Sequence, residues 1–165
     1  MALKGDRFEG THDIKHFMNE VAERGGIASV STAGSGSALD QSANLVTYKA
    51  SGSGAKPVGI LLTDMVNKDQ TRTHINYQKN ETQKGGKVPL LKYGFVVTNM
   101  IHPQVTPAGG DAAYVGASGL ITNTAAAGGP VTGAESTRVL PIGEFETGKD
   151  EDGYATVFVN LPQRV

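Results

Sequence analysis

A short, dense apolar run at residues 58–62 most constrains what this chain can fold into. The run follows Pro57 and is interrupted only by Gly59. It is far too short to cross a membrane, and its length suits a strand that is buried on both faces. Two further apolar blocks, at residues 87–101 and 154–161, have the same character. Together the three blocks predict one β-rich core.

Composition favours many short elements joined by turns. The 165 residues include 22 glycines, and no apolar run is long enough for a membrane span. There is no cysteine, which excludes a disulfide scaffold and any thiolate metal site. The length suits one core. We therefore expect an all-β fold: a compact domain like a β-barrel or β-sandwich at residues 25–165, preceded by a short arm and an amphipathic helix at residues 1–24.

Alternating side chains and turn residues indicate where the other strands lie. A hairpin is expected around Ala117 and Ser118, and a second one with a charged tip at residues 147–153. Gly94 is expected to bend the strand that contains it, and Pro89 to mark an edge or a bulge because it has no N–H to donate. The remaining strands are predicted at residues 27–31, 44–50, 71–77, 111–115, 119–122, 138–146 and 154–161. The segments 32–42 and 123–133 are predicted to be exposed loops.

Two strands carry a prediction about which side chains share a face. In the central run, Ile60 and Leu62 point to one side and Leu61 to the other. If both faces are buried, all three side chains belong to the core. In the last strand, the even-numbered positions 154–160 occupy one face. The apolar side chains of Ala155, Val157, Val159 and Leu161 occupy the other.

The first 24 residues are predicted to contain the chain's helix, at residues 13–24. Ile14, Phe17, Met18 and Val21 have the spacing of one helical face, and Thr11 or Asp13 can cap the start. Glycines 25 and 26 would end the helix. The polar segment before it reads as an extended arm.

Candidate metal ligands occur in patterns that chance also produces. His12 and His16 would share one side of the predicted helix, but no third ligand is evident. Asp64, Asp69 and His74 are a second possible set. Residues 150–153 resemble the start of a calcium loop without its spacing or its closing glutamate, so a solvated hairpin tip is favoured.

The sequence contains no recognisable catalytic motif. The glycines form neither a phosphate-binding loop nor a dinucleotide fingerprint, and Ser118 does not have the spacing of a nucleophile elbow. A glycosidase pair could be chosen from Glu144, Glu146 and Asp150, but nothing selects among them. The net charge of −1 gives no basic face for nucleic acid. We expect no enzyme activity, no cofactor, no metal, no nucleic acid and no membrane partner.

Four segments, read together, resemble the decoration (cement) proteins of tailed-bacteriophage capsids. They are KPVGILLTDMV, THINYQKNETQKGGKVPLLKYGFVVTN, GDAAYVGASGLIT and GEFETGKDEDGYATVFVNLP. The resemblance covers roughly the last two-thirds of the chain and carries no catalytic residue. It implies a homotrimer that binds the major capsid protein on the outer surface of the virion, after synthesis in the host cytoplasm. Such a protein stabilises the head by complementary surface and symmetry.

The segment 1–24 is expected to reach the capsid shell or a neighbouring subunit, because a short amphipathic helix beside a polar arm often orders on a partner. The competing interpretation is that the helix simply packs on its own domain. The alternative function is a receptor- or carbohydrate-binding module of a phage fibre or adhesin, which the low aromatic content disfavours. A hydrolase with a cryptic carboxylate site is the third. The contact candidates are Arg7, Phe8, Ile14, Phe17, Met18 and Val21.

Overall fold

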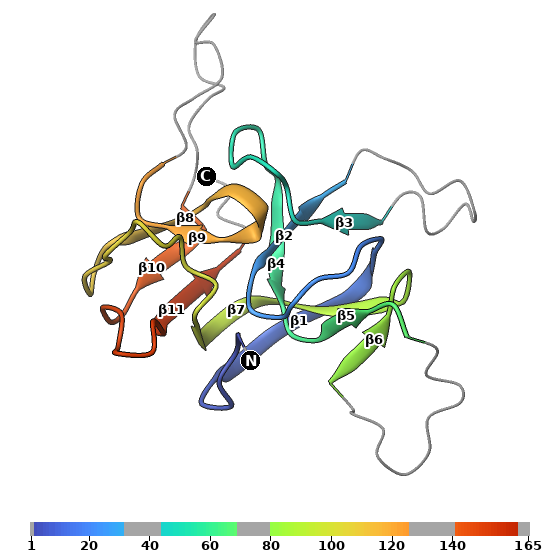
Figure 1. Cartoon of the computed structure of the whole chain (residues 1–165), viewed down its shortest axis with the longest axis horizontal. Helices are drawn as coiled ribbons and strands as arrows, with labels where there is room; N and C mark the ends of the chain where they lie inside the picture. The colour runs from blue at the N-terminus through green and yellow to red at the C-terminus, as the bar shows by residue number, and fades with distance from the viewer. Residues whose placement is uncertain (1, 32–43, 69–79, 126–140, 162–165) are drawn as a thin grey trace, which may run out of the picture.

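The computed structural model describes residues 2–31, 44–68, 80–125 and 141–161, which form β-strands and one 3-10 turn, η2 (Ala117–Gly119) (Figure 1). The all-β prediction is confirmed. No helix in these ranges is long and apolar enough to span a membrane. The strands are β1 (Phe8–Met18), β2 (Ile27–Val30), β3 (Leu45–Thr47), β4 (Pro57–Leu61), β5 (Asp64–Val66), β6 (Glu81–Gln83), β7 (Lys87–Thr98), β8 (Ala112–Val115), β9 (Ile121–Thr122), β10 (Gly143–Phe145) and β11 (Ala155–Asn160).

Nine of these strands form one mixed sheet in the order β1-β3-β2-β4-β7-β11-β10-β8-β9. Because β1 also pairs with β7, the pairings β1–β3–β2–β4–β7–β1 form a closed circuit. Strands β11, β10, β8 and β9 extend the sheet beyond β7 as a separate wing (Figure 1). The strands β5 and β6 pair in parallel outside the large sheet.

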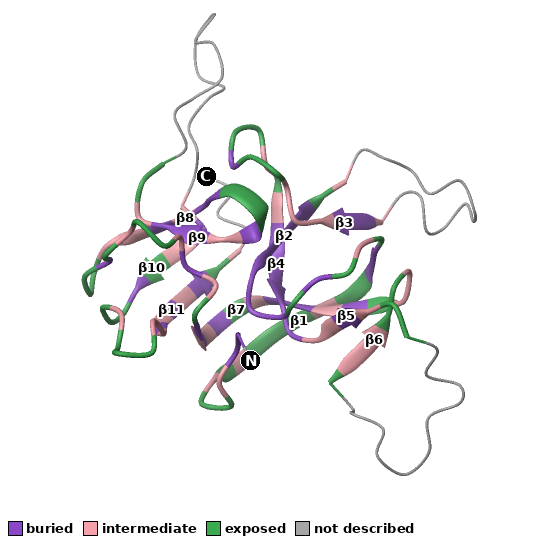
Figure 2. Cartoon of the chain, viewed as in Figure 1, coloured by how far each residue is buried: buried purple, intermediate pink, exposed green. Residues whose placement is uncertain are grey.

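The central strand β4 lies between two hydrophobic cores, as its sequence predicts. Ile60 and Leu62 pack into the larger core, which the wing strands cover with Phe145 and Val157. Leu61 packs into the smaller core, inside the circuit of strands. All three side chains are buried, and Figure 2 colours most of β4 as buried. The prediction that both faces of this strand are buried is confirmed.

The two predicted hairpins are present. Strands β10 and β11 pair antiparallel, and the apolar face of β11 is buried in the larger core while Leu161 packs against it. Strands β8 and β9 also pair antiparallel, with η2 as their connection. The first strand of the last hairpin is shorter than predicted, at Gly143–Phe145. Its expected beginning at residues 138–140 lies outside the described residues, as do the strand at 71–77, the loop at 32–42 and the segment 126–133 of the second loop.

Strand β7 joins the two parts of the fold. Its first half pairs with β4 and its second half with β11, while β1 occupies its other edge. Pro89 lies where the pairing with β1 shifts between Asp13 and His16, which agrees with the predicted bulge. Gly94 has φ of 141°, and a Cβ there would lie 2.1 Å from the carbonyl oxygen of Phe8. Glycine is therefore required where β1 and β7 approach.

The predicted helix at residues 13–24 is wrong. Residues up to Met18 belong to β1, which pairs with β7 along most of its length. The segment after β1 is held by tertiary contacts: Ala22 exchanges backbone hydrogen bonds with Met65, of 3.1 and 2.8 Å. Gly25 does take a positive φ, 101°, so the expected glycine turn is present without a helix before it.

The spacing of apolar residues predicted a helix in place of β1 because this strand is irregular. Its register with β7 shifts three times, between Glu9 and Thr11, between Thr11 and His12, and between Asp13 and His16. Each shift interrupts the two-residue alternation by which a strand is recognised. The edge of β7 supplies the tertiary reason for a strand, since an unpaired long edge leaves backbone donors and acceptors without partners. That demand outweighs a weak local helix preference.

Candidate functional site on the outer face of the sheet

The six predicted contact residues do not form one surface. Phe8, Ile14 and Val21 are 52%, 65% and 60% exposed. In contrast, Phe17 is only 9% exposed and Met18 is fully buried in the smaller core. Met18 cannot contact a partner without unpacking this core. The candidate surface on the first 24 residues therefore reduces to three exposed apolar side chains.

Arg7, the sixth contact candidate, is half-buried and forms an ion pair with Glu9. Glu9 also lies 3.2 Å from the Nε2 atom of His12. Both members of the Arg7–Glu9 ion pair are thus partly buried. The charge of Arg7, just before β1, is therefore already neutralised by Glu9 on that strand.

A half-buried ion pair joins β1 to β7. The ammonium of Lys92 lies 2.6 Å from the carboxylate of Asp13, and the N–H of Lys15 donates to the same carboxylate. Burial alone would raise the pKa of Asp13, but the bonds from Lys92 and Lys15 outweigh it and lower the pKa to about 2. Next to it, burial lowers the pKa of His16 despite the attraction of Asp13. This cluster fixes the register of the two strands.

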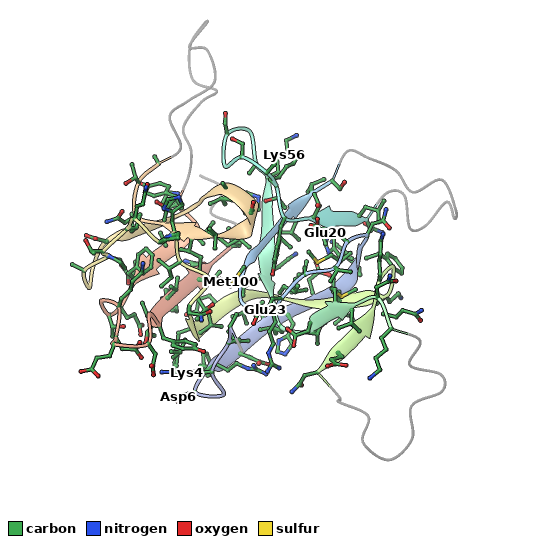
Figure 3. All side chains as sticks on the ribbon, viewed as in Figure 1. Lys4, Asp6, Glu20, Glu23, Lys56 and Met100 are labelled. Carbon is green, nitrogen blue, oxygen red and sulfur yellow. The ribbon has the colours of Figure 1, made fainter. Side chains whose placement is uncertain are left out.

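The segment between β1 and β2 is also fixed. Glu20 lies beside β3 (Figure 3), where the hydroxyl of Thr47 donates to its carboxylate at 2.6 Å and the N–H of Tyr48 donates to the same oxygen. The N–H of Arg24 donates to Asp64 at 2.9 Å. The hydroxyl of Tyr48 donates to the carbonyl of Glu23 at 2.6 Å. Exposed Val21 is thus presented on an anchored segment.

The beginning of the chain contacts the tip of the last hairpin. Lys4 donates to the carboxylate of Asp150 at 2.9 Å and lies 4.1 Å above the ring of Tyr154 (Figure 3 labels Lys4). The other carboxylate oxygen of Asp150 accepts the N–H groups of Asp152 and Tyr154. These bonds lower the pKa of Asp150, with Lys4 the largest cause. One carboxylate oxygen thus stabilises the turn and the other binds Lys4, and residues 150–152 are exposed at the tip of the β10–β11 hairpin, as predicted.

Four of the ten aromatic side chains gather on the outer face of the sheet, the face turned away from the larger core. Phe8, Phe95 and Phe158 stand directly opposite one another across β1, β7 and β11. The rings of Phe8 and Phe95 stack at 5.9 Å, and Tyr93 meets Phe158 edge-to-face at 5.4 Å. We call these four residues the aromatic patch. Counting aromatic residues missed it, because strand pairing rather than sequence spacing brings them together.

A cleft opens at one end of the aromatic patch. It has a volume of about 340 Å³ and is lined by Phe158, Glu144, Asn160, Pro141 and Gly143, among others. Glu144 on β10 stands opposite Phe158, and Asn160 stands opposite Tyr93. An aromatic ring, a carboxylate and an amide thus converge on one concave surface. Glu146 and Asp150, the other acids considered for a glycosidase pair, do not line this cleft.

The metal candidates find little support in the described residues, which hold no group of three or more His, Asp or Glu side chains placed for a metal. His12 and His16 lie on β1 instead of a helix, each beside a carboxylate. Asp69 and His74 lie outside the described residues. Asp64 accepts the N–H of Arg24.

The comparisons with known proteins found no matching family model, curated protein or solved structure. The segments on which the predicted resemblance to decoration proteins rests fall on β4 and β5, on β6 and β7, on the β8–β9 hairpin and on the β10–β11 hairpin, while residues 73–79 lie outside the described residues. Those elements build the two cores and the wing. The resemblance therefore lies in residues that determine the fold, and the exposed side chains must be argued from their own chemistry.

Proposed function

We propose that this chain is a structural virion protein that binds the outer surface of a phage capsid as a homotrimer and stabilises the head. The carrying observation is the exposure of large apolar side chains in the first part of the chain. Three of the five large exposed hydrophobic residues in the described ranges, Phe8, Ile14 and Val21, lie within 14 positions of one another. The major capsid protein is the proposed partner.

The rigidity of this surface supports a docking role. Ile14 stands on a strand that the Asp13–Lys92 pair holds to β7, and Val21 is flanked by the anchored Glu20 and Ala22. A preorganised surface loses less conformational entropy on binding than a disordered one. The contact is therefore proposed to be made by a folded strand and the segment after it, in place of the helix expected from the sequence.

The closed circuit of strands supports the compact barrel-like architecture that we propose for this role. Met18, Val46, Leu61 and Leu90, which come from four strands of the circuit, pack in one core, and this supports the proposal that the start of the chain belongs to a small barrel. A clamp between capsid subunits has to transmit load without local unfolding. A strand within such a circuit meets that need better than a terminal arm.

The test uses expanded, empty heads assembled from the major capsid protein encoded with this chain. The full chain is expected to co-sediment with the heads. The double variant Ile14→Lys with Val21→Lys is expected to bind at least about tenfold more weakly, because two charges are desolvated in a contact that was apolar. Val30→Lys is the matched control, since Val30 is also an exposed β-branched residue but lies on β2.

The outcomes separate the contact from the function. If the full chain binds heads and the double variant loses much more affinity than Val30→Lys, both the function and the proposed contact are supported. Equal binding by the double variant moves the contact elsewhere on the molecule. A full chain that does not co-sediment at any saturating concentration contradicts the proposed function itself.

A further inference from the structure

The aromatic patch shares Phe8 with the proposed capsid contact, but Tyr93, Phe158 and the cleft lie outside that contact. Tyr93 is 44% exposed although it touches Phe158, so the cost of leaving an aromatic ring in water has not been removed by packing. Three of the rings come from strands that are paired in register, which sets them at the fixed spacing of the sheet. The patch is therefore a rigid array of ring faces and edges beside an open cleft.

The polar groups at the cleft define what kind of ligand the patch suits. Glu144 supplies a carboxylate that accepts hydrogen bonds, and Asn160 supplies an amide that both donates and accepts. Neither is deeply buried, so each can exchange water for a ligand hydroxyl at low cost. A pocket with an apolar wall and a few placed polar groups is the usual form of a small-ligand site.

Sugar chemistry matches this combination. A pyranose ring has one face rich in C–H groups, which packs on an aromatic ring, and an edge of hydroxyls, which pair with carboxylates and amides. A nucleic acid would also stack on aromatic rings, but it requires cations along its phosphates. Among the described residues that line the cleft there is no Lys or Arg, and the one charged side chain is the acid Glu144. The same carboxylate disfavours anionic sugars by repulsion.

We infer that the cleft between β10 and β11, with the aromatic patch beside it, binds a neutral oligosaccharide. The ring of Phe158 supports one sugar from within the cleft, and Tyr93 supports a neighbouring unit along the strand direction. Glu144 accepts hydroxyl hydrogen bonds, and Asn160 fixes the orientation of the ring. This inference is independent of the capsid contact and holds whether or not the chain binds heads.

The test titrates the full chain with maltohexaose, cellohexaose and chitohexaose, followed by screening against an array of neutral oligosaccharides. At least one neutral oligosaccharide is expected to bind. Tyr93→Ala and Asn160→Ala are each expected to weaken that binding by about tenfold or more, and Glu144→Gln by a similar factor. Glu151→Gln is the matched control, because Glu151 is an exposed carboxylate at the hairpin tip, remote from the cleft in the β10–β11 hairpin.

Melting curves, oligonucleotide binding and the oligomeric mass serve as further controls. Asn160 is exposed, so its truncation leaves the cores intact, and melting curves of all variants establish that they are folded. The inference is overturned if no neutral oligosaccharide binds, or if the cleft variants bind as well as the control. It is also overturned if a single-stranded thymidine 20-mer binds in place of the sugars. A change in oligomeric mass caused by Tyr93→Ala would assign the patch to a second copy of the chain and would equally overturn it.

Discussion

Single residues determine how closely the strands of this molecule pack. Gly94 is the sharpest case, because β1 crosses it so closely that any Cβ would overlap the carbonyl of Phe8. Its φ of 141° adds a conformational demand that other residues meet poorly. The sequence indicated a bend at Gly94, but the close approach of β1 could not be anticipated while residues 13–24 were interpreted as a helix.

Gly94→Ala is expected to lower the free energy of unfolding by about 3 kcal/mol or more, since both strain and overlap with backbone atoms must be relieved. Gly110→Ala is the matched control: Gly110 also has a positive φ, 92°, but nothing lies within 4 Å of the added Cβ. That change is expected to cost only about 1 kcal/mol. Urea denaturation of the two variants measures the difference, and equal losses would show that the β1–β7 approach is looser than described.

The two faces of β4 offer a second residue-scale prediction. Ile60→Ala and Leu61→Ala are each expected to cost about 2–5 kcal/mol, because each leaves a cavity in a fully packed core. The two side chains belong to different cores, so the losses of stability in the two single variants are expected to add nearly fully in the double variant. Denaturant titration of the single and double variants measures both points. Losses below about 1 kcal/mol at either site would mean that the corresponding core is misplaced.

The pH dependence of stability follows from Asp13. Its pKa in the folded chain, about 2, lies below the ordinary 3.8, so the ionised form stabilises the fold above about pH 4. That contribution is lost as the pH falls from about 4 towards 2. Asp13→Asn is expected to cost about 1–3 kcal/mol at pH 7 and to flatten the loss over this acid range. A variant with an unchanged slope of stability against pH in that range would contradict the role of the Asp13–Lys92 pair.

At the scale of elements, the strongly apolar strands could be predicted and the irregular one could not. Strands β4, β7 and β11 carry enough buried apolar side chains to be recognised from the sequence alone, in a continuous run in β4 and in strict alternation in β11. Strand β1 is held by its pairing with β7 and by the Asp13–Lys92 contact, which join residues far apart in the chain. The short strands β5 and β6 were missed as well, since three residues carry too little pattern.

The correction at β1 reverses one expectation. If residues 1–24 were a separate arm, their deletion would leave residues 25–165 folded with a nearly unchanged melting temperature. That division remains a prediction, but the packing argues against it, because Leu3 and Met18 are core residues and β1 covers an edge of β7. Deletion of residues 1–24 is now expected to abolish cooperative thermal unfolding, as followed by circular dichroism. A truncated chain that melts within a few degrees of the full chain would support the original prediction that residues 1–24 are a separate arm.

At the scale of the whole molecule, the fold class could be predicted from the sequence and the surface could not. Glycine turns and apolar strands specify an all-β chain wherever they pair. The aromatic patch depends on which strands become neighbours, and its residues lie between positions 8 and 158. The exposed contact residues were partly found, since Phe8, Ile14 and Val21 are on the surface. Phe17 and Met18 were wrongly predicted to be exposed: they lie at the end of β1, and their side chains are buried.

The proposal that this molecule decorates a capsid is tested most directly by electron cryo-microscopy of heads incubated with the full chain. We predict additional density on the outer surface, in groups of three copies around a local threefold axis, into which the described strands fit. When the structure is fitted into this density, Ile14 and Val21 should contact the capsid shell. Heads that carry no additional density at saturating protein, or that carry it as isolated single copies, would contradict the account.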